Sequence, residues 1–519
     1  MTLNVAPEPF TELEPALKSL SRTALVRRGL TALLVGAAFP LALAPIDWWA
    51  SAIISMAALS WLVRDVPLRA GLCLFYLYGV GFYGVGVSWV FVSIHEHGGA
   101  SILLAALLVS LFVLALALFF LLQGYVYLRC FRSLPFGLSL GFASVWVARE
   151  WLLTWFLTGF PWLFSGYGFL DNPMAGYGPV LGVLGISFLV AWQAALLSGL
   201  LRPTGSSIAR DRVVSIGTVC LLWLGGWVLQ QQPFVVPGPD VLRVSAVQGN
   251  IDQHTKWSRA MVQPIMQTYT DLSESEWQRD LVVWPEASVT VFREYADEFL
   301  DPIAERALAN GSALLLGIPD RDEQGRFLNS ALVVGTGEGR YVKRRLVPFG
   351  EYVPLEQWLR GLIRLFDLPM SRNVSGPEEQ LPLRVGEHFI AMSICYEVIY
   401  PELVRRSVAT PDLLVTISND TWFGASLGPW QHLQMAQMRA LENGRYMVRA
   451  TNNGLTAVID AQGHITGQLP QFETGVLRAD VPVMVGVTPY ARWGLLGLAM
   501  LMGFMWISVS VRVMTRRLG

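Results

Sequence analysis

The chain has 519 residues, of which 53% are hydrophobic and only 15% are charged. Its mean hydropathy of +0.44 is too high for a water-soluble protein of this length, so we expect part of the chain to lie in a membrane. The formal net charge of −1 argues against a nucleic-acid partner, because nucleic-acid-binding surfaces are strongly basic.

Hydrophobic runs predict a multi-span α-helical membrane domain of about eight transmembrane helices. A helix that crosses the bilayer needs ~20 apolar residues, a length that several runs reach and the second does not. Seven runs precede a more polar region and one follows it. The runs lie near residues 30–46, 48–63, 71–94, 99–123, 135–158, 176–201, 213–230 and 493–511.

The uneven distribution of charge divides the chain into four segments. Residues 29–233 carry only 8 Lys and Arg and 6 Asp and Glu, as expected of a membrane domain. We expect a cytoplasmic tail over residues 1–28 and a polar domain over residues 234–488. Residues 489–519 then form a last transmembrane helix with a short cytoplasmic tail.

The positions of arginine predict the orientation in the membrane. Alternate loops along the chain contain arginine, whereas the opposite short loops near 44–47, 95–98 and 159–175 contain no Lys or Arg. Because cytoplasmic loops are enriched in these residues, both termini are predicted to be cytoplasmic. Seven spans then place residues 234–488 outside, in the periplasm of a cell with two membranes. If one helix were miscounted, residues 234–488 would instead lie on the cytoplasmic side.

Two charged residues, Arg149 and Glu150, interrupt the fifth hydrophobic run. Charges inside a membrane are costly and indicate a functional site by default. Adjacent residues face different sides of a helix, so we expect no simple pairing between them. They either support a lipid-facing cavity, or Arg149 extends its charged end to the membrane surface. The aromatic loop 160–169 is interpreted as an interfacial belt or as the floor of a lipid entrance.

The polar region alternates strand-like and helix-like segments after a linker that contains Pro233 and Pro237. Such alternation predicts a layered α/β domain, although the pattern does not show how the layers stack. Strand patterns lie near 242–248, 281–284, 313–318, 329–335, 339–343, 413–418, 448–452 and 455–459. Helical patterns lie near 258–278, 293–309 and 431–445.

Three residues with complementary chemistry end or follow strand-like runs. Glu286 follows one run, Lys343 ends another, and Cys395 ends a third just before a helix predicted to begin at Pro401. Cys395 is therefore predicted on a strand-to-helix bend, where free backbone N–H groups favour a thiolate and a neighbouring oxyanion. A free cysteine is often only a small core residue. Together, however, the three residues supply a base, an oxyanion donor and a nucleophile.

The other cysteines give no sign of a disulfide framework or a metal site. Cys73, Cys130 and Cys220 lie in or beside hydrophobic runs, and no Cys/His spacing of a metal site occurs. We therefore expect neither a cofactor nor a metal.

The residues around the three candidates resemble those of a known family. WPE at 284–286, K…LVPFGEYVP over 343–354 and ICYE at 394–397 are similar to motifs of the apolipoprotein N-acyltransferases of Gram-negative bacteria, which are membrane members of the nitrilase superfamily. The resemblance covers the whole chain, because that family also has hydrophobic helices on both sides of a nitrilase-like domain. It implies an αββα sandwich and a Glu-Lys-Cys catalytic triad.

The resemblance also implies a reaction. A fatty acyl chain moves from a membrane phospholipid to the N-terminal α-amine of a diacylglyceryl-cysteine lipoprotein, through a thioester. Donor, acceptor and bilayer are then the partners, and we expect a monomer in the inner membrane. A membrane-tethered amidase or nitrilase is one alternative, but it needs neither eight spans nor apolar lids. A transporter or scaffold is another, and it leaves the ordered Glu, Lys and Cys unexplained.

The chemistry assigns a role to each candidate residue. A free thiol has a pKa near ~8.5, so Glu286 is expected to take its proton with a pKa that burial raises. Lys343 and the backbone N–H of Tyr396 are expected to stabilise the oxyanion. The resemblance gives Glu351 a supporting role beside Lys343, and lets Tyr396 and Glu397 shape the site. The alternatives are a surface carboxylate at Glu351 and a helix-start charge at Glu397.

Two apolar segments are candidates for covering the site. Residues 355–367, which include Trp358, show helical spacing and form either a packed amphipathic helix or an arm on the bilayer surface. Residues 422–430 contain glycines that allow motion and aromatic residues that are able to cover acyl chains. These aromatic residues are Trp422, Phe423 and Trp430.

Overall fold

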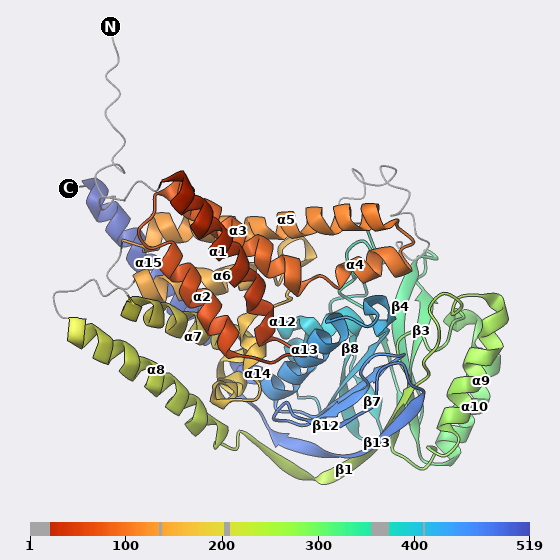
Figure 1. The fold of residues 1–519 in the computed structure, drawn as a ribbon. Coiled ribbons are helices and arrows are strands. Elements are labelled where there is room, and N and C mark those ends of the chain that lie inside the picture. The colour runs from red at the N-terminus through yellow and green to blue at the C-terminus, as the bar shows by residue number, and fades with distance from the viewer. Residues whose placement is uncertain (1–20, 134–136, 202–207, 354–372, 408–409, 519) are drawn as a thin grey trace.

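The structure is a computed structural model, and it describes residues 21–133, 137–201, 208–353, 373–407 and 410–518. A bundle of helices forms one part of the molecule and a domain with two β-sheets forms the other (Figure 1). The long helix α8 leads from the bundle to the first strand of the sheet domain, and α15 returns the chain to the bundle after the last strand.

The helices of the bundle coincide with the predicted hydrophobic runs. They are α1 (Arg22–Ala38), α2 (Ala50–Leu62), α3 (Leu68–Gly86), α5 (Ile102–Val126), α6 (Phe142–Leu152), α7 (Gly178–Leu201), α8 (Ile208–Gln230) and α15 (Leu496–Leu518), with the short α4 (Val90–Val92) between α3 and α5. Among the described residues, 5 helical stretches are long and apolar enough to cross a membrane. The apolar helices Ala50–Leu62 and Leu496–Ile507 are shorter, so the number of eight spans stays a prediction.

Large apolar side chains cover the outside of the bundle. On α5, Leu103 is 81% exposed, and on α8, Val213 and Leu221 are 71% and 67% exposed. A water-soluble protein rarely exposes such apolar bands, whereas lipid chains cover them at no cost. The bundle therefore has the surface of a membrane domain.

The charged pair of α6 is buried inside the bundle. Arg149 is only 4% exposed, and its guanidinium lies 3.9 Å from the ring centroid of Phe120. The alternative in which Arg149 extends to the membrane surface is therefore wrong. The expectation that Arg149 and Glu150 stay apart is also wrong, because the long arginine side chain brings its Nη2 within 3.5 Å of Glu150 Oε1.

The loop 160–169 is packed rather than interfacial. Glu150 Oε1 accepts hydrogen bonds from Trp146 Nε1 at 2.8 Å and from the N–H and hydroxyl of Ser165 at 3.0 and 2.7 Å. Phe160 is partly buried, and the loop's other aromatic residues, Trp162, Phe164, Tyr167 and Phe169, are at most 1% exposed. The prediction of an aromatic belt is wrong, since aromatic residues suit a core as well as an interface.

The polar domain is a sandwich of two sheets. The first has the order β13-β1-β2-β3-β4-β6 and the second the order β12-β11-β10-β9-β8-β7-β5. The strands of the first are β1 (Val235–Gln248), β2 (Leu281–Val283), β3 (Ala313–Arg321), β4 (Phe327–Gly335), β6 (Arg340–Val342) and β13 (Gly475–Gly486). Those of the second are β5 (Gly337–Glu338), β7 (Leu383–Val385), β8 (His388–Ile394), β9 (Leu413–Ser418), β10 (Met447–Thr451), β11 (Ala457–Ile459) and β12 (Ile465–Gln468).

Helices cover both outer faces of the sandwich. On the first sheet lie α9 (Val262–Ser273) and α10 (Asp297–Ala309), and on the second α12 (Pro401–Arg406) and α13 (Gly428–Asn443) (Figure 1). Apolar residues of both sheets, such as Val244 and Val415, form one core between them. The αββα sandwich is therefore confirmed. The apolar face of α13 also joins the core of the membrane bundle, so the two parts share a packed interface.

The first and last strands of the sandwich lie side by side. β1 and β13 pair antiparallel from Val235↔Gly486 to Gln248↔Gly475, so both connections to the bundle leave the same corner. The predicted linker around Pro237 instead belongs to β1. A register shift between Pro237 and Val241 accommodates the proline, which cannot donate a ladder hydrogen bond.

Candidate active site

Loops from both sheets bring the three candidate residues together. Glu286 follows β2 and Lys343 follows β6 in the first sheet, while Cys395 follows β8 in the second. Cys395 has φ of +52° and begins a helical turn, Cys395–Ile399. The predicted strand-to-helix bend is therefore confirmed, and its left-handed backbone conformation is one that non-glycine residues seldom adopt outside functional sites.

The Glu286 carboxylate is held by three donors. Lys343 Nζ lies 3.3 Å and Asn329 Nδ2 2.7 Å from Oε1, and the backbone N–H of Asn419 lies 2.9 Å from Oε2. Lys256 Nζ donates to the Glu286 backbone carbonyl at 3.2 Å. Glu286 is only 7% exposed, so these donors replace water around its charge.

These donors overturn the expected pKa shift of Glu286. Burial raises the pKa of this carboxyl, but Lys343, the Asn329 hydrogen bond and Lys256 together hold it below its usual range. The prediction of a raised pKa is wrong, because it considered burial without the two lysines. Glu286 is therefore ionised at neutral pH and free to accept a proton.

Burial has the opposite consequence for Cys395. Burial and, to a lesser extent, the charge of Glu286 raise the pKa of the Cys395 thiol to about 12, although Lys343 opposes the shift. The expectation that the bend favours a thiolate is therefore wrong for this state of the site. A buried neutral thiol next to an ionised carboxylate needs that carboxylate to remove its proton during attack.

Lys343 lies between two carboxylates. Its Nζ is 2.9 Å from Glu351 Oε1 in addition to its contact with Glu286, and Glu351 Oε2 accepts from the backbone N–H of Val347 at 2.8 Å. Both carboxylates raise the pKa of Lys343 well above its usual range against the effect of burial. The Glu351 side chain is 12% exposed, which excludes the alternative of a surface carboxylate.

Glu397 joins the lysine loop to the cysteine loop. Its Oε1 accepts from the backbone N–H of Arg344 at 2.6 Å and its Oε2 from that of Ile394 at 2.8 Å. Tyr341 donates its hydroxyl to both oxygens, at 3.0 and 2.9 Å. Glu397 is completely buried. Its carboxylate therefore fixes the backbone beside Lys343 and Cys395. The alternative in which Glu397 is only a charge at the start of a helix is wrong.

Tyr396 connects the site to the membrane domain. Its hydroxyl donates to the backbone carbonyl of Gly159 at 3.3 Å, and that of Tyr400 donates to the carbonyl of Thr158 at 2.9 Å. Tyr352 and Thr158 share a hydrogen bond of 2.7 Å between their hydroxyls. The loop after α6 thus lies directly against the residues that flank Cys395.

The structure describes only one of the two segments that are candidates for covering the site, residues 422–430. Trp358 and the segment 355–367 lie outside the described residues. Phe423 is 9% exposed and lies 4.8 Å from Trp89 between ring centroids, while Ser93 Oγ donates to the Trp422 carbonyl at 2.7 Å. Trp430 is half-buried against the bundle. The segment 422–430 is therefore packed on the membrane domain, and its motion stays a prediction.

Sequence reasoning missed several polar residues of the site. Asn329 and Lys256 contact Glu286, and a buried network of Asp420, His432 and Arg449 lies behind Cys395. Asp420 follows the buried strand β9, a signal that was available. His432 and Arg449 gave no such signal, because only the folded chain brings them together. Among the described residues no cluster of His, Cys, Asp and Glu has the arrangement of a metal site.

Comparison with known proteins identifies the family. Residues 35–196 match the family model of the apolipoprotein N-acyltransferase N-terminal domain, and residues 243–490 match that of the carbon-nitrogen hydrolases. The apolipoprotein N-acyltransferase of Pseudomonas syringae pv. tomato is 47% identical over 494 residues, covering 93% of this chain and 97% of the relative. The chain belongs to the apolipoprotein N-acyltransferase family.

A second relative carries the same name. The apolipoprotein N-acyltransferase of Pseudomonas paraeruginosa is 47% identical over 481 residues, covering 91% of this chain and 93% of the relative. Among solved structures, an amidase from Nesterenkonia sp. is 19% identical, with a TM-score of 0.35 over 50% of this chain and 95% of the amidase.

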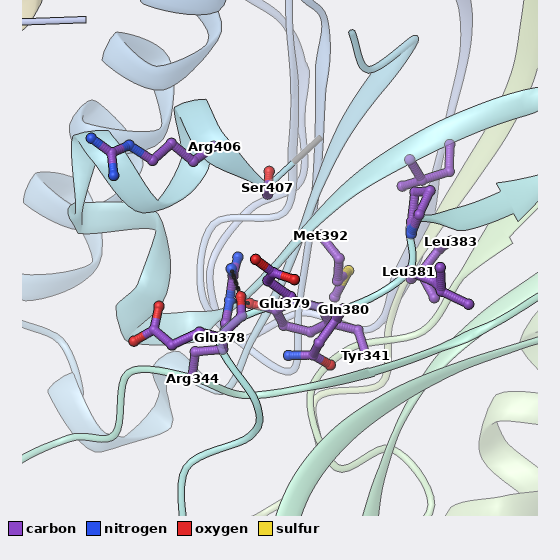
Figure 2. Close-up of a pocket in the computed structure, with 12 residues that line it drawn as sticks. Tyr341, Arg344, Glu378, Glu379, Gln380, Leu381, Leu383, Met392, Arg406 and Ser407 are labelled. Carbon is purple, nitrogen blue, oxygen red and sulfur yellow. Dashed lines mark hydrogen bonds between the residues drawn. The ribbon is translucent and has the colours of Figure 1, made fainter. Parts of the chain in front are cut away.

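A small cavity lies beside the candidate active site but is not lined by its three central residues. It has a volume of about 150 Å³. Arg344 and Glu378 lie at one end of it and Leu381 and Leu383 at the other (Figure 2). Glu286, Lys343 and Cys395 do not line it, so it borders the lysine loop without opening onto the nucleophile.

Glu351 provides a first prediction. Glu351→Gln keeps the size of the side chain but removes one of the two charges that position Lys343, so we expect acyl transfer to fall by roughly 10- to 100-fold. The exposed Glu323→Gln, on the turn after β3, is the matched control. Initial rates with equal amounts of folded protein test this expectation, and a wild-type rate for Glu351→Gln would contradict it.

Proposed function

We propose that this chain transfers a fatty acyl chain from a membrane phospholipid to the N-terminal α-amine of a diacylglyceryl-cysteine lipoprotein, through a thioester on Cys395. One observation supports this most. Glu286, Lys343 and Cys395 are buried together, and the residues beside Cys395 contact the membrane domain. The names of the relatives support lipoprotein N-acylation as the reaction.

The first half-reaction forms the thioester. Cys395 Sγ attacks the ester carbonyl of the phospholipid while Glu286 takes the thiol proton. Lys343 and the backbone N–H of Tyr396 stabilise the oxyanion of the tetrahedral intermediate. The intermediate collapses as the C–O bond of the ester breaks, and Glu286 returns the proton to the departing lysophospholipid oxygen.

The second half-reaction transfers the acyl chain to the amine. An α-amino group has a pKa near ~8 and a lysine side chain one near ~10.4, so the α-amine is the better nucleophile at neutral pH. It attacks the thioester, Glu286 takes the proton that the amine releases, and this proton returns to the sulfur as the C–S bond breaks. A covalent intermediate lets the lysophospholipid leave before the second lipid arrives.

Water has to be excluded while the thioester waits for its acceptor. Cys395 is 9% exposed and Lys343 is 1% exposed, so little water reaches either residue. The Thr158–Gly159 loop of the membrane domain contacts the residues beside Cys395. This contact supports entry of both lipids from the membrane side.

The orientation of the domain is a second prediction. The arginine pattern of the loops places both termini in the cytoplasm and residues 234–488 in the periplasm of the inner membrane. Reporter fusions after Ser206 and after Ser375 are expected to show opposite sides of the membrane. Signals from the same side would contradict this topology.

The pKa shifts give a third prediction. Glu286, with its lowered pKa, loses its charge only as pH falls below ~4.5, and Lys343, with its raised pKa, loses its proton only above ~10.5. The Cys395 thiol ionises only as pH rises toward about 12. Formation of the acyl-enzyme is therefore expected to be nearly constant between pH 6 and 9, whereas transfer to the amine rises up to pH ~8.

Acid-quench trapping with donor alone measures the first step, and addition of a lipopeptide to acylated enzyme measures the second. A tenfold rise of the first step per pH unit between pH 6 and 8 would contradict this prediction, because it would indicate a free thiolate as the reacting species.

Mass spectrometry of products tests the proposed function. Purified protein is incubated with phosphatidylethanolamine and a diacylglyceryl-cysteine peptide that also contains a lysine. We expect one acyl chain on the α-amine, none on the lysine, and ping-pong kinetics. Free fatty acid as the main product would indicate a hydrolase, and intersecting double-reciprocal plots would indicate direct transfer.

A further inference from the structure

A buried polar network contacts the backbone of Cys395. His432 Nε2 lies 3.1 Å from the Cys395 carbonyl oxygen. His432 Nδ1 lies 3.1 Å from Arg449 Nη2, and Arg449 Nη2 lies 2.5 Å from Asp420 Oδ2. His432 and Arg449 are completely buried and Asp420 is 1% exposed, and the thiol chemistry described above uses none of their side chains.

The partners of His432 determine the direction of its hydrogen bond to Cys395. A carbonyl oxygen only accepts hydrogen bonds, so Nε2 carries a hydrogen and donates it to Cys395. Nδ1 lies 3.1 Å from Arg449 Nη2, which only donates, and 3.2 Å from Asp420 Oδ1, which accepts, so these two side chains hold the ring in place. Burial and the charge of Arg449 lower the pKa of His432, which agrees with a neutral ring. Asp420 balances the buried charge of Arg449.

The hydrogen bond to Cys395 also orients the next N–H group. Among the described residues the cis peptide bond is Ala44-Pro45, so the Cys395–Tyr396 peptide is trans. In a planar trans peptide the C=O and N–H bonds point in opposite directions. A donor that fixes the Cys395 carbonyl therefore aims the Tyr396 N–H away from His432, and polarisation of the peptide strengthens that N–H as a donor.

A residue of the membrane domain packs against the His432 ring. The ring of Trp162, in the loop 160–169, stacks on the imidazole with centroids 5.9 Å apart and an angle of 24° between the ring planes. Trp162 Nε1 donates to Gln431 Oε1 at 2.7 Å. Membrane-domain packing thus restrains the residue that contacts the nucleophile's backbone.

We propose that His432, which donates from Nε2 to the Cys395 carbonyl, is a positioning residue that orients the Cys395–Tyr396 peptide so that the Tyr396 N–H stabilises the oxyanion. The inference rests on the proposed function only in that Cys395 forms a thioester through a tetrahedral intermediate. It assigns to His432 an effect on acyl transfer to the thiol and no effect on reactions of the thiol that lack an oxyanion.

Two reagents separate these effects on the purified full-length protein. p-Nitrophenyl butyrate acylates Cys395 through an oxyanion: the thiol proton passes through Glu286 to the departing p-nitrophenolate as the thioester forms. Iodoacetamide alkylates the same sulfur by direct displacement of iodide as Glu286 takes the thiol proton, with no oxyanion. We expect His432→Ala to slow acylation by roughly 100-fold, the typical effect of one oxyanion donor, and to leave alkylation within about twofold of wild type.

Conservative variants and a control complete the test. His432→Gln places an amide N–H near the position of Nε2 and is expected to recover at least about a tenth of the acylation rate, whereas His432→Asn, which is shorter, is not. His464→Gln, at an exposed histidine, is expected to match wild type with both reagents.

Three results would overturn the inference: a wild-type acylation rate in His432→Ala, an equal loss of acylation and alkylation, or equal rates for the Gln and Asn variants. The last comparison holds even if the alanine variant fails to fold. If p-nitrophenyl butyrate acylates wild type but phospholipid does not, the proposed acyl donor is refuted. The role of His432 is then still tested by the reaction with p-nitrophenyl butyrate.

Discussion

Cys395→Ala is expected to abolish acyl transfer, with a rate at least on the order of 10⁴-fold below wild type. The proposed thioester needs the sulfur, and no other cysteine replaces it: Cys73, Cys130 and Cys220 lie in the helical bundle, on α3, near the end of α5 and on α8. The neighbouring groups that position the thiol stay in place, because Glu286 and Lys343 keep their contacts with Asn329 and Glu351.

The experiment needs proof that the variant folds. Alanine fills the same left-handed backbone position without a new side-chain contact, so the thermal unfolding temperature is expected to stay within a few degrees of wild type. Cys220→Ala, at an exposed cysteine of α8, is the matched control and is expected to keep full activity. Residual transfer above about one per cent in folded Cys395→Ala would exclude Cys395 as the nucleophile.

Lys343→Met is expected to slow formation of the acyl-enzyme by at least roughly 100- to 1000-fold. Methionine keeps most of the side-chain volume but removes the buried charge that we propose stabilises the oxyanion. The change also leaves the carboxylates of Glu286 and Glu351 without the cation between them, although both still accept from Asn329. Without the lysine between them, the two carboxylates repel each other, and this repulsion disfavours the ionised form of Glu286. The pKa of Glu286 is therefore expected to rise.

This rise gives Lys343→Met a distinctive pH profile. A base with a raised pKa is protonated as pH falls, so the remaining acylation rate is expected to increase with pH between 6 and 8, where wild type is nearly constant. Arg326→Met, at an exposed ion pair with Asp322, serves as the control. A flat profile with a near-normal rate would remove Lys343 from the oxyanion role.

The sequence predicted the site where local pattern and chemistry agree. The buried runs that end at Glu286 and Cys395 are recognisable as strands from their apolar residues, and Pro401 correctly marked the start of α12. The spacing of these elements did not predict the two-sheet arrangement, because strand order depends on contacts between distant segments. That arrangement came from the resemblance to a family.

The errors of the sequence analysis have physical causes as well. The pKa of Glu286 depends on Lys256 and Asn329, which are 30 and 43 residues away in the chain and reach the carboxylate only after folding. The loop 160–169 was misjudged because the same aromatic residues suit a membrane interface and a core. Its burial follows from Glu150, which holds Ser165, and from packing against α13.

The most direct test of the proposed mechanism is the mass of the protein after incubation with phospholipid in the absence of an acceptor. We expect wild type to gain the mass of one acyl chain, mapped to the peptide that contains Cys395, to lose it in neutral hydroxylamine, and to release it to a lipopeptide. Cys395→Ala is expected to gain nothing. Full transfer activity in a wild-type protein that never carries this adduct would contradict the thioester and show that the acyl chain moves directly from donor to acceptor.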